Sequence, residues 1–508
     1  MSLRRLLRCA AVARLGSVAA ATAVSKLLTL GSLAYAARVL GPEGWGLVGA
    51  ALAAVAYASV LLSPGLMTWG TREIARDRGQ AVASLALVNL TQLAMACGAF
   101  CVVAALGRFW LDDPPARAVL VVSAAALFAQ AFSVDWVFDG LERSDVAVGL
   151  QLAVSALRLA AVVGLCRSPA DVLLYAAILP ASLGLQAFAG YVLLYRGGWF
   201  RPRWPGLGRW RQALRAAWPL GVTMALFVLA HNANTLLVQA LHGSRAAGQY
   251  LAALRFVEMA SVLPGVLGAV FRPRLARVCW ADAALAARET RLYARAHLLA
   301  GWLLAALVFA EAPSIIGWLY GEPYADAAPL LRIFSLAVLA NYLVCGSTNC
   351  LVAFGRDRAV MRAMAVSGAV SIGAGVALTL WWGPPGAALA ASLIHPVAWL
   401  GALGEYRRTV GPIEWRGWRR PCAAAAAVIA LSWLLESRGV PTPWRIACAA
   451  TAYAAIAGRC WLELQRGVLD RLPAAPRSPG ASAGGHGAGA APGAPPAKAD
   501  AAPIGVGA

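Results

Sequence analysis

Long apolar stretches, separated by short breaks rich in glycine, proline and arginine, follow one another from about residue 17 to residue 465. Most hold about twenty residues, which lets a helix cross the ~30 Å hydrocarbon core of a bilayer. Backbone groups in lipid must bond within their own segment, and the alternation of a β-barrel is not seen. The pattern therefore predicts an all-α polytopic membrane protein with about fourteen transmembrane helices. The predicted spans are 17–39, 46–66, 81–107, 117–138, 146–166, 170–195, 216–240, 247–271, 293–319, 328–353, 360–382, 385–403, 421–437 and 444–465.

The basic residues orient these spans. With the amino terminus in the cytoplasm, the large majority of the arginines fall in inner segments, as the positive-inside rule requires. An even number of spans then places both termini in the cytoplasm. The net charge of +21 follows from this topology, so we expect no nucleic-acid partner.

Two stretches about 200 residues apart have glycine, proline and arginine at matching positions, which predicts an internal repeat. The first runs from Ala37 to Arg76 and the second from Val238 to Arg277. A parallel repeat of two six-helix bundles places a central cavity between them. The matched features are Gly41 and Gly46 with Gly243 and Gly248, Pro64-Gly65 with Pro264-Gly265, and Arg72 with Arg272.

The repeat and the composition divide the chain into five parts. The two predicted lobes of six helices each are joined by a basic cytoplasmic linker, and two extra helices follow the second lobe. The segment beyond them is rich in Ala, Gly, Pro and Ser and is predicted to be disordered. The predicted parts are residues 1–195 (lobe one), 196–215 (linker), 216–403 (lobe two), 404–470 (extra helices) and 471–508 (tail).

The sequence then resembles a known family. "LAYAARVLGPEGWG", "PGLMTWGTREIAR" and "AAGQYLAALRFVEMASVLPGVLGAVFRPRLAR" are similar to the polysaccharide (O-antigen, Wzx-like) flippases of the multidrug/oligosaccharidyl-lipid/polysaccharide exporter superfamily. The resemblance covers roughly residues 15 to 465 and rests on Gly, Pro and Arg patterns. It implies a transporter that carries polyprenyl-pyrophosphate-linked oligosaccharide from the inner to the outer leaflet of the bacterial plasma membrane. It also implies alternating access between two lobes, membrane lipids and glycan polymerase machinery as partners, and no enzymatic activity or cofactor.

Charged residues within spans are the candidate substrate ligands, because each costs about 2.5–3.5 kcal/mol at a helix centre on insertion scales. Lys26 lies near the middle of the first span, with Ser25 and Thr29 beside it, and Arg158 lies in the middle of the fifth. Arg255, in the eighth span, suits a pyrophosphate because its guanidinium binds two oxygens at once. Each of these two assignments has an alternative. Lys26 could instead extend its side chain to the cytoplasmic surface. Arg255 could instead only neutralise Glu258, three residues further along the same helix.

Polar residues complete the predicted cavity. Asn232 and Asn234, in the seventh span, are candidates to bond sugar hydroxyls, or else they join helices. Asp135 and Glu258 are candidates for coupling to a proton or sodium gradient. Glu311 is expected to reach water near an outer end, and Trp45 to belong to an interfacial aromatic belt. The cysteines form no CxxC pair, so no metal is expected.

Three alternatives share parts of this reading. A cation-coupled multidrug exporter of the same architecture would favour an acidic cavity, whereas the charges near the membrane centre are mainly basic. A peptidoglycan-precursor flippase has the same predicted helix count. A membrane-embedded glycosyltransferase typically needs a large outer loop with catalytic residues, and the predicted outer loops are short.

Overall fold

The computed structural model describes residues 3–62, 65–198, 207–278, 283–411 and 418–469, and over these ranges the chain is helical without a β-strand. Residues Met1–Leu464 form one compact unit. The predicted tail, 471–508, lies outside the described residues. The first half contains α1 (Leu3–Leu62), α2 (Leu66–Arg76), η1 (Arg78–Gln80), α3 (Ala81–Trp110), α4 (Pro114–Ala124), α5 (Ala126–Ala131), α6 (Asp135–Gly140), α7 (Ser144–Leu165), η2 (Pro169–Asp171) and α8 (Val172–Arg196).

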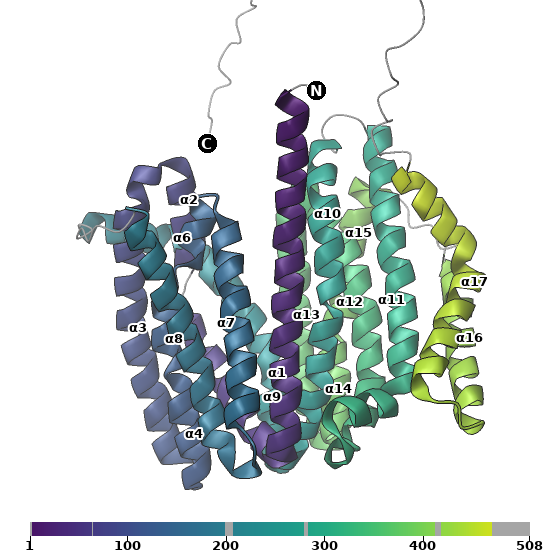
Figure 1. Ribbon diagram of the computed structural model, residues 1–508, viewed down its shortest axis with the longest axis horizontal. Helices are drawn as coiled ribbons and strands as arrows, with labels where there is room; N and C mark the ends of the chain where they lie inside the picture. The colour runs from purple at the N-terminus through teal and green to yellow at the C-terminus, as the bar shows by residue number, and fades with distance from the viewer. Residues whose placement is uncertain (1–2, 63–64, 199–206, 279–282, 412–417, 470–508) are drawn as a thin grey trace, which may run out of the picture. The chain divides into compact units, whose positions relative to one another are not determined.

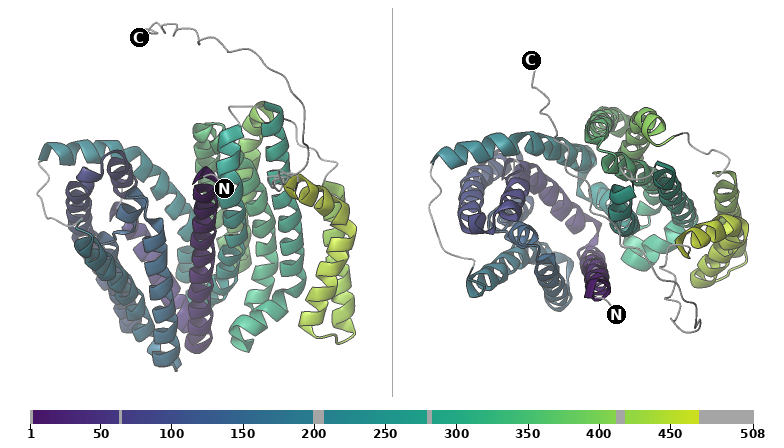
Figure 2. Two further views of the ribbon diagram at one scale, coloured as in Figure 1. Left: turned by 45° about the horizontal axis from the view of Figure 1, so that its top comes forward. Right: turned by 90° about the horizontal axis from the view of Figure 1, so that it is seen from above.

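The second half of the described chain is also built from helices. Helix α9 packs against α1, α11 packs against α12, and α16 packs against α11 (Figure 1, Figure 2). Its elements are α9 (Leu207–Ala260), α10 (Val262–Val278), α11 (Ala283–Tyr320), η3 (Glu322–Tyr324), α12 (Ala327–Ala353), α13 (Asp357–Trp382), α14 (Pro384–Ser392), α15 (Ile394–Thr409), α16 (Arg419–Ser437) and α17 (Thr442–Leu469).

Helices α1 and α9 each contain one sharp break at a glycine. Gly41 has φ 71° and ψ 172°, and Gly243 has φ 80° and ψ 179°. This region of backbone space is open almost only to glycine. Each long helix therefore consists of two segments, and the breaks lie in the two turns that the sequence predicted. The shared geometry supports the repeat, which itself stays a prediction.

The second pair of matched features differs between the halves. Gly65 adopts a left-handed conformation, with φ 74°, and precedes the short amphipathic helix α2. Gly265 lies inside α10. The predicted second span therefore ends earlier than expected, and α2 buries Leu66 and Ile74.

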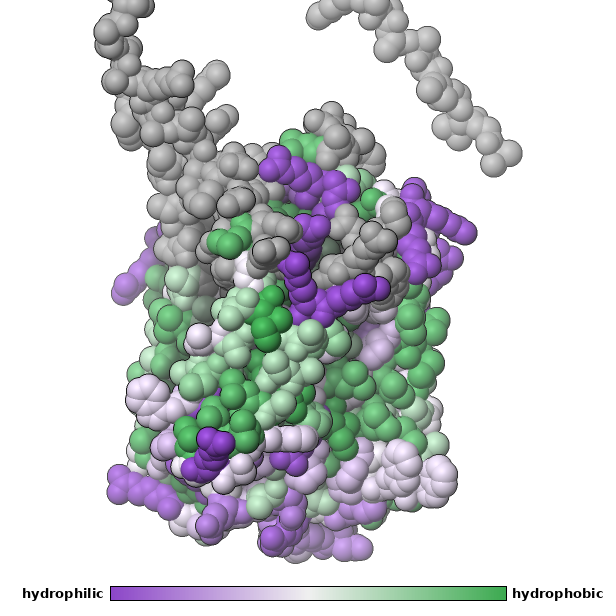
Figure 3. All heavy atoms as spheres, turned by 90° about the vertical axis from the view of Figure 1, so that its right-hand side faces the viewer, coloured by the Kyte–Doolittle hydropathy of each residue, from purple (hydrophilic) through white to green (hydrophobic). Residues whose placement is uncertain are grey.

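The chain is an integral membrane protein. Nine segments of the described helices are long and apolar enough to cross a bilayer. One of them, Ala20–Val60, turns back at Gly41 and so covers two predicted spans. Figure 3 shows a hydrophobic band between hydrophilic ends on one face of the molecule. The predicted spans over α9, α10, α16 and α17 are not among the nine, so the count of about fourteen stays a prediction.

The fourth predicted span is interrupted. Instead of one helix over 117–138, the structure has α4, α5 and the short α6, which begins at Asp135. Asp113 caps α4 by accepting a hydrogen bond from the N–H of Ala116 at 3.3 Å, and the prolines that follow suit a first turn. The interruption between α5 and α6 is not foreseen by hydropathy, because a window of Pro114–Gly140 has a mean hydropathy of 1.8, as a continuous span would.

Two residues expected near water or at the interface are buried. Glu311 is only 2% exposed, because its carboxylate lies 2.8 Å from Nη2 of Arg445 and accepts a hydrogen bond from Ser432. This cluster joins α11 to α16 and α17. Trp45 is also buried, with its ring centroid 5.9 Å from that of Tyr175. The expectations for Glu311 and Trp45 were wrong, since hydropathy does not reveal a partner so distant in sequence.

Candidate functional site

Polar side chains of α1 and α7 meet where the two helices pack. The hydroxyl oxygens of Ser25 and Ser155 are 2.9 Å apart. Arg158 donates a hydrogen bond from Nη2 to the Thr29 hydroxyl at 2.6 Å. Spacings of three and four residues put each pair on one helical face. Ser25 and Thr29 of the first span therefore face α7.

Lys26 lies beside this contact. It follows Ser25 by one residue, so it leaves the helix about 100° further round, on an exposed surface that also contains Val24 and Leu27. Within the described ranges, neither Lys26 nor Arg158 forms an ion pair with a carboxylate. These two cations of membrane-spanning helices are therefore without a neutralising acid among the described residues.

Arg255 and Glu258 form an ion pair in the second segment of α9. Nη1 of Arg255 lies 2.6 Å from Oε2 of Glu258, and Nε2 of His231 lies 3.1 Å from the other carboxylate oxygen. The three side chains are between 25% and 39% exposed, so the cluster is only partly covered by protein. Nε of Arg255 is buried and has no hydrogen-bond partner. The guanidinium is thus only partly satisfied by Glu258.

Tyr175, at the start of α8, lies near both Arg158 and Arg255. It is close enough to both Arg158 and Arg255 for their charges to act on its phenol. The helices that contribute these residues, α7, α8 and α9, belong to both predicted lobes. Tyr175 was not singled out from the sequence, where one tyrosine in an apolar stretch gives no signal of charged neighbours.

The two asparagines of α9 have different surroundings. Asn232 donates to the carbonyl of Val228 in its own helix, at 3.0 Å, and is half-buried. Asn234 is fully buried against α13, where a Cβ added to Gly375 would lie 2.1 Å from its Oδ1. Residues two apart on a helix point in nearly opposite directions. The pair does not present one common face for a sugar.

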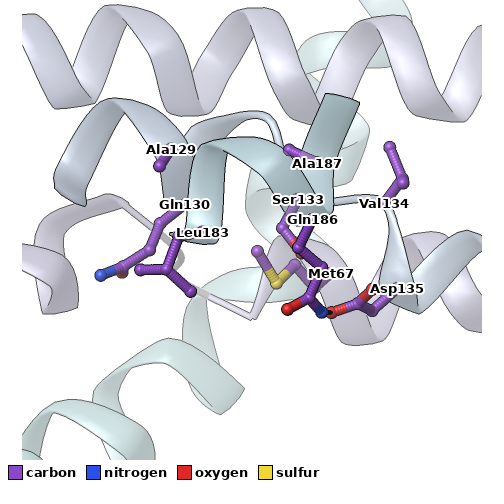
Figure 4. A pocket seen from close by; sticks show the side chains of 9 residues that line it. All are labelled: Met67, Ala129, Gln130, Ser133, Val134, Asp135, Leu183, Gln186 and Ala187. Carbon is purple, nitrogen blue, oxygen red and sulfur yellow. Dashed lines mark hydrogen bonds between the residues drawn. The ribbon is translucent and has the colours of Figure 1, made fainter. Parts of the chain in front are cut away.

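Asp135 lines a cavity of about 140 Å³ whose other lining residues come from α2, α5, the segment before α6, and α8. Its carboxylate accepts a hydrogen bond from Nε2 of Gln186 at 2.7 Å, and Gln130 and Ser133 also line the cavity. Figure 4 shows the side chains of Asp135 and Gln186 directed toward one another. Asp135 forms no ion pair with Arg158 in the described part of the chain, and Arg158 donates instead to Thr29. Gln186 was missed in the sequence, although a polar residue within an apolar span is a signal.

The break at Gly41 lies beside contacts that join the first and second halves of the chain. The Tyr324 hydroxyl donates to the carbonyl of Ala37 at 2.7 Å, and Nη2 of Arg38 donates to the carbonyl of Trp318 at 3.2 Å. Burial raises the pKa of the Tyr324 phenol, so it remains a protonated donor at physiological pH. These bonds hold η3 and α11 against the end of the first segment of α1.

Comparison with protein families gives one match. Residues 12–279, more than half of the chain, match the family described as polysaccharide biosynthesis protein. None of the curated proteins matches this sequence.

Solved structures with the same fold are transporters. The lipid II flippase MurJ, in its inward closed conformation, is similar with a TM-score of 0.73 and 11% identity, over 89% of this chain and 99% of that one. An inward-facing multidrug resistance MATE family transporter of the MOP superfamily is similar with a TM-score of 0.63 and 14% identity, over 76% of this chain and 94% of that one. A MOP superfamily transporter from Pyrococcus furiosus is similar with a TM-score of 0.53 and 14% identity, over 78% of this chain and 94% of that one. At these identities the similarity establishes the fold.

Proposed function

The chain belongs to the polysaccharide biosynthesis protein family, and we propose that it flips a polyprenyl-pyrophosphate-linked oligosaccharide across the bacterial plasma membrane. The lipid-linked sugar moves from the inner to the outer leaflet for surface polysaccharide biosynthesis. The termini lie in the cytoplasm, and glycan polymerase machinery receives the product. The lipid tail stays in the bilayer, while the pyrophosphate and sugar pass through a cationic cavity between the lobes.

One observation carries this proposal: Lys26 and Arg158 lie on packed spans without an acidic partner among the described residues. A lone cation in a span is costly, and such residues mark substrate pathways. An anionic substrate removes the cost by supplying the missing negative charge. The Thr29 hydroxyl fixes the Arg158 guanidinium through one nitrogen and leaves other donors for phosphate oxygens.

Arg255 supplies the cation from the second lobe. Glu258 neutralises it in part, and the unpartnered Nε leaves the guanidinium incompletely bonded. The pyrophosphate competes with Glu258 for Arg255, and His231 holds the released carboxylate. Glu258 thereby adjusts the affinity for the anion, and it is the candidate proton site of lobe two.

Alternating access requires one side of the cavity to close while the other opens. Tyr324 and Arg38 bond across the two halves beside the Gly41 break, which supports a state closed at the predicted outer side. Opening to that side then requires the loss of two hydrogen bonds and of the close packing around the breaks. Each hydrogen bond contributes about 0.5–1.5 kcal/mol net, and the lost packing adds to this cost.

The alternatives differ in the charge and headgroup of the substrate. A multidrug exporter moves organic cations, which Lys26 and Arg158 would repel. A peptidoglycan-precursor flippase moves another pyrophosphate lipid and would use the same cations. The basic charges therefore favour a lipid pyrophosphate, and the family favours a surface polysaccharide unit.

The test is flipping by the full chain in proteoliposomes. Vesicles contain a polyprenyl-pyrophosphate oligosaccharide, and an impermeant sugar-oxidising reagent measures its movement. Lys26→Ala and Arg158→Ala should each lower the flipping rate at least tenfold at equal protein content. Arg108→Ala, an exposed arginine at the end of α3, should keep the rate. Unchanged rates in both cavity variants would refute the cationic cavity. Faster movement of lipid II than of the oligosaccharide would favour the peptidoglycan alternative.

A further inference from the structure

The exposed face of α13 is apolar along most of its length and ends in arginines. Val366 and Val370 are exposed, and Leu380 continues the same face toward the end of the helix. Arg358 and Arg362 precede Val366 at steps of four residues, which place them on this face, and both are exposed. Because α13 is a candidate membrane span, its apolar face is suited to contact with lipid acyl chains. The face therefore changes from apolar to basic within one helical turn.

Two tryptophans mark the opposite end of this face. Trp381 and Trp382 are exposed, and their ring centroids lie 5.7 Å apart in a stacked arrangement. Tryptophan prefers the interface between the hydrocarbon core and the headgroups. The helix from Arg362 to Trp381 is about 28 Å long at 1.5 Å per residue, which is close to the ~30 Å of the hydrocarbon core. Arg362 therefore lies at the level of the phosphates in the other leaflet, the inner one in the predicted orientation.

Helix α15 has a similar exposed face beside α13. Leu400, Gly404 and Arg408 follow one another at steps of four residues and are all exposed. Nothing lies within 4 Å of a Cβ added to Gly404, so the space above this residue is open. The face of α15 thus also passes from an apolar residue, across open space, to an arginine near the end of the helix at Thr409.

The exposed faces of α13 and α15 adjoin. A Cβ added to Gly401 would lie 3.2 Å from that of Ala363, and Gly401 is itself exposed. The exposed face of α15 therefore reaches α13 at Ala363, which directly follows the exposed Arg362. Arg362 and Arg408 consequently border one surface at the same end of the two helices. We call it the α13–α15 surface; it consists of Arg362, Val366, Leu400, Gly404 and Arg408.

The positive charge of this region exceeds its negative charge. Nε of Arg356 lies 3.4 Å from Oε1 of Glu405, which occupies that carboxylate. Within the described ranges, neither Arg362 nor Arg408 forms an ion pair with an acidic side chain. Arginine binds phosphate oxygens well because its guanidinium forms two parallel hydrogen bonds. The charged residues at these two helix ends are Arg356, Arg358, Arg362, Arg407 and Arg408, with Asp357 and Glu405.

We propose that the α13–α15 surface binds an anionic phospholipid, phosphatidylglycerol, of the predicted inner leaflet. Arg362 and Arg408 bind its phosphate, and an acyl chain lies over Gly404 and along Val366. Basic residues beside a membrane attract anionic headgroups. A free phosphate would use the arginines alone, whereas a phospholipid also covers the apolar part of the surface. The site lies on the outside of the second predicted lobe and does not depend on the proposed substrate.

Lipid binding to the full chain tests this site without a transport assay. The protein in detergent is titrated with dioleoylphosphatidylglycerol or dioleoylphosphatidylcholine, and native mass spectrometry measures the affinity for the first bound lipid. Phosphatidylglycerol should bind at least tenfold more tightly, since the two lipids share their chains and differ in net charge. Arg362→Ala and Arg408→Ala should each weaken its binding about fivefold. Equal affinities for the two lipids would overturn recognition of the anion.

Two further variants separate a defined site from general attraction by positive charge. Gly404→Leu fills the open space without changing charge and should weaken phosphatidylglycerol binding severalfold. Arg438→Ala removes an exposed arginine at the other end of the membrane, after α16, and should keep the affinity. Wild-type affinity in Gly404→Leu, or an equal loss in Arg438→Ala, would overturn the site.

The lipid-linked substrate also combines a phosphate with an apolar chain, so it is the alternative occupant. Undecaprenyl pyrophosphate in the same titration should bind with an affinity that Arg362→Ala and Arg408→Ala leave unchanged. If both substitutions weaken its binding but not that of phosphatidylglycerol, the surface belongs to the substrate and the phospholipid is overturned as occupant.

Discussion

Gly46 and Gly248 make reciprocal contacts across the α1–α9 packing. A Cβ added to Gly46 would lie 1.8 Å from the carbonyl oxygen of Ser244, and one added to Gly248 would lie 1.9 Å from that of Pro42. Each glycine thus sits on the residue that directly follows the glycine break of the other helix. The absence of a side chain at both positions lets the two turns touch through their backbones.

Alanine at either position should separate these turns. We expect Gly46→Ala and Gly248→Ala each to destabilise the protein by about 1–3 kcal/mol, because a backbone carbonyl cannot rotate away as a side chain can. Thermal unfolding in detergent measures the loss. Gly149→Ala is the control, since nothing lies within 4 Å of its added Cβ, and it should be neutral or slightly stabilising. Equal effects of all three substitutions would show that the contact is loose.

The Tyr324 hydroxyl should hold the predicted outer side closed. In Tyr324→Phe the bond to the Ala37 carbonyl is lost while the ring stays. Ala37 is buried, so a cysteine placed there in a variant without native cysteines should react slowly with an impermeant maleimide. Adding Tyr324→Phe to this Ala37→Cys variant should raise the reaction rate severalfold. Tyr35→Phe is the control, because Tyr35 donates only within the first half, to Val163 and Cys166. Equal rates with and without the Tyr324 hydroxyl would contradict its role in closure.

The Glu311–Arg445 pair should anchor α17 to α11. Arg445 is 6% exposed, so Glu311→Ala leaves a buried cation with only the exposed Glu436 carboxylate, 3.4 Å away. Removing one partner of a buried ion pair lowers the free energy of unfolding by about 3–5 kcal/mol. We expect a loss at the lower end of this range, because Glu436 still neutralises part of the Arg445 charge. Chemical denaturation measures it.

Two comparisons make this prediction specific. The double variant Glu311→Leu with Arg445→Met should recover most of the stability, because it removes both charges. Arg78→Ala breaks the exposed pair with Glu142 and should cost at most about 1 kcal/mol. A loss in Glu311→Ala no larger than in Arg78→Ala would mean that the buried pair contributes little.

Arg255 and Glu258 should respond differently to substitution if Arg255 binds substrate. Arg255→Gln should abolish flipping, while Glu258→Gln should preserve flipping in vesicles without a proton gradient and alter the substrate affinity, because the arginine is then released from its partner. The double variant should behave as Arg255→Gln does. Flipping rates at several substrate concentrations separate these effects. Equal losses in both single variants would identify a structural pair.

Local features of the sequence determined the elements of this fold. Apolar run length predicted helices such as α3, α12 and α13 to within a few residues, since a span must satisfy its own backbone. The fourth, eighth and twelfth predicted spans are each divided between elements. Gly41 and Gly243 marked the two turns, because their backbone conformation excludes other residues. The family could be recognised from the same Gly, Pro and Arg positions. The cations Lys26, Arg158 and Arg255 stood out because charge is rare in spans.

Only the tertiary structure decided which polar groups meet. Arg158 bonds to Thr29, Asp135 to Gln186 and Arg445 to Glu311, across separations of 51 to 134 residues. Hydropathy is the same whichever helices are neighbours, so it does not distinguish a buried pair from a solvated charge. The break before Asp135 was likewise invisible, because apolar composition is compatible with continuous and interrupted helices. Pairing depends on helix rotation and packing, which arise only when the segments assemble.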